Sequence, residues 1–124
     1  MFNPPEGFEM FAQIHHTERR KSLKVATKIL EKWGCTQHQV DRLLNTNYFE
    51  EPENDSLIRV SYILSIHSSL SLFFSSKESV YSWVSKKNLH PALGGSRALD
   101  LMLTGELREL KKVADIAKSM IYSN

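Results

Sequence analysis

Apolar side chains recur every three or four residues along most of this 124-residue chain, and no segment alternates apolar and polar residues for long enough to form a strand. A spacing of three and four places side chains on one face of a helix, whereas a half-buried strand needs a period of two. The sequence therefore predicts an all-α protein, a compact bundle of about six helices. Its length suits one compact domain, or two very small helical subdomains that share a core.

The first two predicted helices are separated by a short glycine turn. The first helix begins near Thr17 and carries its apolar stripe as far as Trp33. Gly34 follows, and glycine readily adopts the left-handed conformation at which helices end. Thr36 and Gln39 have the spacing of a capping box, which predicts that a short second helix starts at once. This order is how a helix-turn-helix unit begins.

A recognition helix is expected next, but residues 45–55 are poorly suited to form one. They contain Pro52 and four acidic residues, with no basic residue. Negative charge is repelled by phosphates, so we expect weak or absent sequence-specific DNA binding by the chain alone. The polar residues of the second helix and its cap that remain candidates for DNA contacts are Thr36, Gln37, Gln39 and Arg42.

Two features near the N-terminus leave alternatives open. Residues 1–16 form an arm that contains Phe2, Phe8 and Phe11, and this arm packs on its own domain or crosses to a second subunit. Because exposed apolar surface is costly, we expect a homodimer. The lysine-rich face of the first helix is either a solvated surface or a source of non-specific attraction for nucleic acid.

Four further helices are predicted after residue 55. The third runs to about Phe74 and has apolar residues on more than one side, so we expect it to be the central helix. His67 within it is expected to be a half-buried polar residue. The predicted N-terminal caps are Asp55 or Ser56 for the third helix, Ser75 with Glu78 for the fourth, and Ser96 for the fifth.

The composition argues against several functional classes. Lys and Arg number 16 against 14 Asp and Glu, a net charge of +2, which excludes a strongly cationic binder. The single cysteine, Cys35, excludes an internal disulfide and suits a reducing compartment. Its spacing from His38 matches no common zinc module, and no carboxylates form an obvious facing pair. We expect a cytoplasmic protein that is not an enzyme, binds no metal or cofactor, and does not enter a membrane.

The densest unusual stretch is residues 88–105, NLHPALGGSRALDLMLTG. Gly94 and Gly95 allow the backbone to bend sharply and to approach another chain closely. The plain explanation is a tight turn between helices. The surrounding His90, Arg97 and neighbouring lysines also make this stretch the best candidate for a partner surface.

Several blocks of the sequence resemble the Xre/MbcA/ParS antitoxins. These are residues 29–34 (ILEKWG), 41–44 (DRLL), 57–64, 66–70 and 84–105, the last following that family's PNPALGGRSPLELL pattern. The resemblance covers about residues 17–121. One departure is Ala98, where the family usually has proline, and a second is the short acidic segment at 45–55.

The resemblance implies a type II antitoxin that neutralises a RES-type toxin, an NAD-consuming or ADP-ribosylating enzyme. It implies three parts: an arm at 1–16, a degenerate Xre-like helix-turn-helix at 17–56, and a toxin-binding part at 57–124. A DNA-binding regulator and an orphan helical adaptor remain alternatives, and DNA binding is expected to be weak or to need the toxin complex. The implied toxin-binding residues are Asn88, His90, Pro91, Leu93, Gly94, Gly95, Arg97 and Lys111.

Overall fold

A computed structural model describes residues 16–46 and 54–122, and within these ranges every regular element is a helix. The prediction of an all-α bundle of about six helices is confirmed for this part of the chain. Residues 1–15 of the predicted arm and residues 47–53 of the acidic segment lie outside the described residues, whereas His16, predicted to end the arm, is the first residue of a helix. The elements are α2 (His16–Lys32), α3 (Gln37–Leu44), α4 (Asn54–Phe73), α5 (Lys77–Ser82), the 3₁₀ turn η1 (Trp83–Ser85), α6 (Ala98–Met102) and α7 (Leu107–Tyr122).

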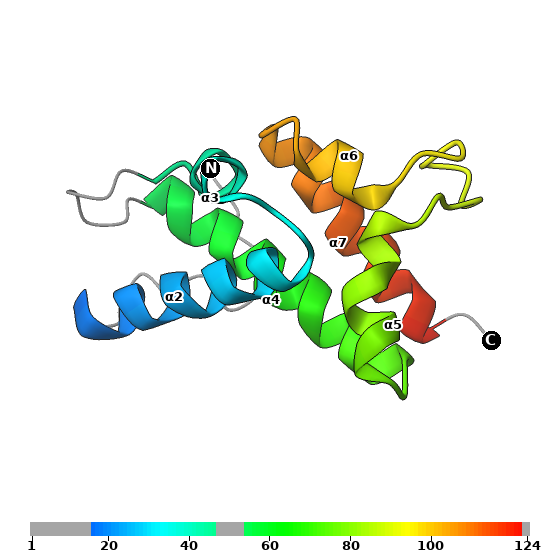
Figure 1. Cartoon of the computed structure of the whole chain (residues 1–124), viewed down its shortest axis with the longest axis horizontal. Coiled ribbons are helices and arrows are strands. Elements are labelled where there is room, and N and C mark those ends of the chain that lie inside the picture. Colours follow the sequence, from blue (N-terminus) through cyan, green and yellow to red (C-terminus); the bar gives the residue numbers. More distant parts are fainter. Residues whose placement is uncertain (1–15, 47–53, 123–124) are drawn as a thin grey trace.

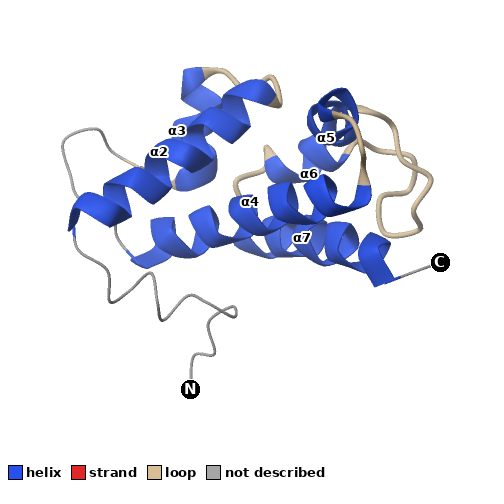
Figure 2. Cartoon of the chain, turned by 90° about the horizontal axis from the view of Figure 1, so that it is seen from below, coloured by secondary structure: helices blue, strands red, loops and turns tan. Residues whose placement is uncertain are grey.

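The central helix is α4, as its multi-sided apolar pattern predicts (Figure 1). It packs against α2 on one side and α7 on the other, and α3 and α5 also contact it (Figure 2). Val60, Ile63 and Ile66 have no exposed surface. Within the described ranges α4 is also the one helix long and apolar enough to cross a membrane by composition, but half of that stretch is buried inside the bundle. Its hydropathy is accounted for by its central position.

The turn between α2 and α3 forms as the sequence predicts. Gly34 has a φ of +95°, which only glycine adopts without strain, and α2 stops before it. The Thr36 hydroxyl accepts the Gln39 N–H at 3.2 Å, and the Gln39 side chain accepts the Thr36 N–H at 2.8 Å. This capping box satisfies two otherwise free backbone donors and starts α3.

The predicted N-terminal caps of α4 and α5 are wrong. The helix α4 already begins at Asn54, so Asp55 and Ser56 lie inside its first turn. At α5 the capping hydroxyl belongs to Ser76, which accepts the Ser79 N–H at 3.2 Å, one residue later than the predicted pair of Ser75 and Glu78. That start leaves Val80, Trp83 and Val84 buried against the core.

The start of α6 also differs from the prediction of a Ser96 cap. The helix begins at Ala98, and the Asp100 carboxylate accepts the Arg97 backbone N–H at 3.2 Å. The carboxylate in the first turn satisfies the exposed N–H of the capping residue itself, a different donor from the one that a Ser96 hydroxyl would bind. Ala98 itself is fully buried, so this position, the first departure from the resemblance, packs into the core.

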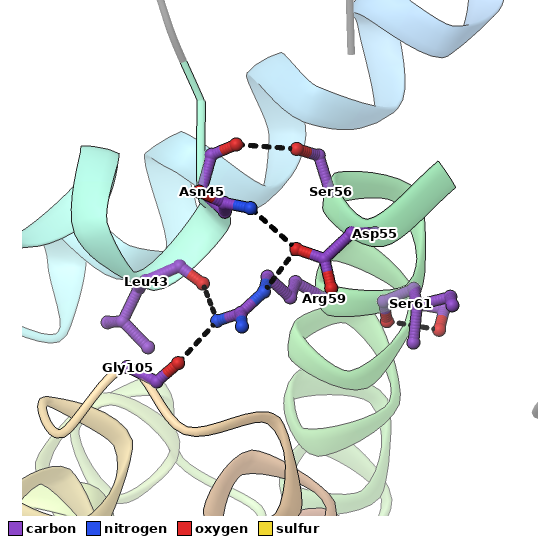
Figure 3. A network of polar contacts seen from close by, with 8 residues as sticks. Leu43, Asn45, Asp55, Ser56, Arg59, Ser61 and Gly105 are labelled. Carbon is purple, nitrogen blue, oxygen red and sulfur yellow. Dashed lines mark hydrogen bonds and ion pairs between the residues drawn. The ribbon is translucent and has the colours of Figure 1, made fainter. Parts of the chain in front are cut away.

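Arg59, on α4, connects the end of α3 to the turn before α7 (Figure 3). Its guanidinium donates to the Leu43 carbonyl of α3 at 3.0 Å and to the Gly105 carbonyl before α7 at 2.8 Å. Asp55 accepts from the Arg59 Nε and from the Asn45 side chain, so it orients the guanidinium. The expected boundary between residues 56 and 57 falls within α4, and one buried cluster spans both parts.

Candidate partner interface

The loop that carries the double glycine is held in one conformation by its own backbone hydrogen bonds. Lys87 and Arg97 face each other in an isolated antiparallel bridge at its base. Inside that bridge the Asn88 N–H donates to the Ser96 carbonyl at 3.1 Å, and the Gly95 N–H donates to the Asn88 carbonyl at 3.0 Å. A loop with these paired groups needs no partner to set its shape.

His90 organises the tip of this loop. Its carbonyl accepts the N–H groups of Leu93 and Gly94 at 2.8 and 3.1 Å, and its ring Nδ1 accepts the Ala92 N–H at 3.1 Å. The Asn88 side chain in turn accepts the His90 N–H at 2.9 Å. Leu93 is buried and fastens the loop to the core. The two glycines have φ angles of +55° and +85°, so the double glycine is required by the turn itself.

A cavity of about 410 Å³ lies between this loop and α7. The loop contributes His90, and α7 contributes Lys111, so two predicted toxin-binding residues from separate segments meet at one place. The chain folds this way because α7 buries its apolar stripe, including Leu110, Val113 and Ala117, and thereby turns its basic side outward. The lining residues are His90, Ala92, Arg108, Lys111, Lys112, Asp115, Ile116 and Ser119.

The cations of the cavity are paired with carboxylates along α7. Lys111 Nζ lies 2.9 Å from Asp115, and Lys112 Nζ lies 3.4 Å from Glu109. The hydrogen bond that Lys111 donates to Asp115 raises the pKa of Lys111, which therefore stays charged at neutral pH. Both lysines and Asp115 are exposed to solvent, so these pairs contribute little to folding stability. Their side chains remain free to exchange partners on binding.

Arg97, another implied toxin-binding residue, lies at the base of the loop and is paired within the chain. Its guanidinium lies 2.6 Å from Asp100 in the first turn of α6, and it does not line the cavity. The hydrogen bond between them lowers the pKa of Asp100 and raises that of Arg97. Of the other predicted residues, Pro91 is exposed on the loop, whereas Asn88, Leu93 and the glycines shape it.

The four predicted DNA-contacting residues all make hydrogen bonds within the chain. Thr36 and Gln39 form the capping box, and the Gln37 side chain donates to Asp41 at 2.9 Å. Arg42 donates to the Thr104 carbonyl at 3.4 Å, toward the α6–α7 turn. Gln37 and Arg42 are exposed on the short helix α3. Residues 45–55, which follow α3 where a helix-turn-helix has its recognition helix, lie mostly outside the described residues.

No metal-binding group appears in the described ranges, 16–46 and 54–122: nowhere there do three or more His, Cys, Asp or Glu side chains converge. Cys35 is buried, and burial raises the pKa of its thiol to about 11, so it stays protonated at neutral pH. A protonated thiol is a poor nucleophile and a poor metal ligand. His38 is exposed on the first turn of α3.

Arg108 and Lys112 also line the cavity, although the sequence-based prediction did not include them. Their signal was present, because positions 108, 112, 115 and 119 recur at helical spacing and share one side of a helix. What no local pattern provides is the position of the loop over that side.

Comparison with known proteins gives no match for this chain among protein-family models, curated proteins or solved structures.

Proposed function

We propose that this chain is an antitoxin that binds and neutralises a RES-type toxin. The observation that carries the proposal is the cavity at which His90 and Lys111 lie together. Both residues were expected to contact the toxin from the sequence resemblance, although twenty residues separate them in the chain. A surface built from a pre-shaped loop and a rigid helix loses little conformational freedom on binding, which favours a stable complex.

The proposed mechanism is obstruction. The toxin is the enzyme in this pair, and the antitoxin contributes a bound surface that covers the toxin's active site. The chain itself supplies no catalytic group, metal or cofactor to that inhibition. We further propose that it acts in the cytoplasm as a homodimer, and that DNA binding is weak or requires the toxin complex.

The test is co-expression with the RES-type protein encoded beside this gene. We expect the wild-type chain to restore growth and to co-purify with that protein. Lys111→Glu should weaken co-purification, because it reverses a charge at the cavity. Lys118→Glu reverses an exposed charge on the same helix outside the cavity and should have no effect. The absence of an adjacent RES-type gene, or growth arrest despite co-expression, would refute the proposal.

A further inference from the structure

The loop beside the cavity exposes one large apolar side chain. Leu89 is 94% exposed, more than any other large hydrophobic residue in the described ranges. It directly precedes His90, which lines the cavity, and the loop projects away from the helices in both overall views (Figures 1 and 2). A single exposed leucine is common on protein surfaces and by itself indicates nothing.

Leu89 differs from an ordinary exposed leucine because its backbone is fixed. On one side of it, Asn88 is held by hydrogen bonds to Ser96 and Gly95 across the base of the loop. On the other side, the His90 N–H is bound by the Asn88 side chain, and the His90 carbonyl accepts two further N–H groups. An anchor held by such a frame is already ordered before binding, so burying it costs little backbone entropy.

The segment that carries Leu89 has more basic than acidic residues. Residues 86–122 contain seven Lys and Arg against four Asp and Glu, a net charge of +3, which exceeds the +2 of the whole chain. Lys86 and Lys87 are exposed at the base of the loop, and Arg108, Lys111 and Lys112 line the cavity next to it. An apolar side chain in a basic surround complements an apolar pocket with an acidic rim.

We propose that Leu89 is the anchor residue of the partner interface, and that the partner presents an apolar socket rimmed by carboxylates. This inference rests on the proposed function, in which the partner is the RES-type toxin. Burial of Leu89 in the socket supplies affinity, since interface energy concentrates in a few central side chains. The basic residues around it supply the association rate and the orientation of the partner.

The test compares substitutions at Leu89 with a matched substitution elsewhere. Leu89→Ser should weaken binding of the RES-type protein encoded beside this gene by about 10- to 100-fold, mainly through faster dissociation. Leu89→Met should retain most of the affinity, because methionine keeps the apolar volume. Leu72→Ser removes a leucine that is 73% exposed at the end of α4 and should leave binding unchanged. Circular dichroism should show equal helix content in all variants.

The acidic rim proposed for the partner is tested by the salt dependence of the association rate. Raising the salt concentration should slow association of the wild-type chain with the adjacent RES-type protein, while the dissociation rate should change little. Wild-type affinity retained by Leu89→Ser would overturn the anchor assignment but leave the antitoxin proposal intact. An association rate insensitive to salt would overturn the acidic rim. Failure of the wild-type chain to bind this protein at all would overturn both proposals.

Discussion

The Arg59 guanidinium donates a hydrogen bond of 2.8 Å to the Gly105 carbonyl, across 46 positions of sequence (Figure 3). The same nitrogen reaches the Leu43 carbonyl at 3.0 Å, so one side chain satisfies the end of α3 and the turn before α7. Asp55 accepts the Nε hydrogen at 2.9 Å and completes a charge-assisted pair. Because the Arg59 side chain is only 11% exposed, water cannot replace these bonds easily.

Arg59→Met should therefore lower the free energy of unfolding by about 2–4 kcal/mol, because it leaves the Leu43 and Gly105 carbonyls without their donor and removes the cation that pairs with Asp55. Chemical denaturation followed by circular dichroism measures this change. The matched control is Arg108→Met, at a side chain that is 85% exposed, and its effect should stay within about 0.5 kcal/mol. Equal losses in the two variants would contradict the role given to Arg59.

Protonation of His67 should destabilise the fold in mild acid. Burial, and secondly the charge of Lys32, lower the pKa of His67 below 6.5 in the folded protein. Its ring lies 3.1 Å from the Tyr81 hydroxyl. Above the pKa that His67 has in the unfolded protein, its ring is neutral in both the folded and the unfolded state, so it does not make stability depend on pH there. As the pH falls below 6.5, the unfolded state takes up a proton first, and stability decreases until the folded pKa is passed.

The measurement is the free energy of unfolding of wild type and His67→Gln between about pH 7 and about pH 5. The variant should lose less stability than wild type over this interval, even if it starts less stable. His38→Gln changes an exposed histidine on α3 and should follow the wild-type profile. Parallel profiles for wild type and His67→Gln would show that His67 does not govern the acid response.

Arg97 should influence toxin binding through Asp100 rather than by direct contact. Arg97→Glu places two carboxylates side by side at the start of α6 and should weaken co-purification with the toxin. The charge-swapped variant, Arg97→Glu with Asp100→Arg, restores opposite charges and should recover most of the binding. If the swapped variant binds no better than Arg97→Glu, Arg97 contacts the toxin itself.

Sequence-specific DNA binding by the chain alone should be weak or absent. The helix α3 has eight residues, and Thr36, Gln37, Gln39 and Arg42 are engaged within the chain. Gel shifts at physiological salt should show similar, salt-sensitive affinities for the promoter of its own gene and for a scrambled duplex. A tight shift that resists competitor DNA would contradict this prediction.

The chain should form a homodimer through its N-terminal half. The basis is the apolar sequence of the arm, with Phe2, Phe8 and Phe11, whose exposure in a monomer is costly. Light scattering at tens of micromolar should report a mass twice that of the chain, and replacing the three phenylalanines by serine should halve it. A clean monomer for the intact chain would refute the prediction.

Helix content and several helix ends follow from local sequence. Gly34 stops α2 because a φ of +95° is open to glycine, and Thr36 and Gln39 start α3 because their side chains reach backbone donors three residues apart. An N-terminal cap is harder to predict from sequence where two adjacent residues are of the same capping type. Ser75 and Ser76 are locally interchangeable, and packing of Val80 and Trp83 against the core accompanies the start at Ser76.

The sequence by itself determined that the chain is helical, which faces of its helices are apolar, and where the glycine turns fall, because these depend on neighbours within about four residues. The tertiary structure alone decided which distant groups meet. It brought Arg59 to the Leu43 and Gly105 carbonyls, and His90 to the same cavity as Lys111. The reason is that burial of the α4 and α7 stripes fixes the placement of whole helices, and a polar side chain acquires its partners only once that packing is set.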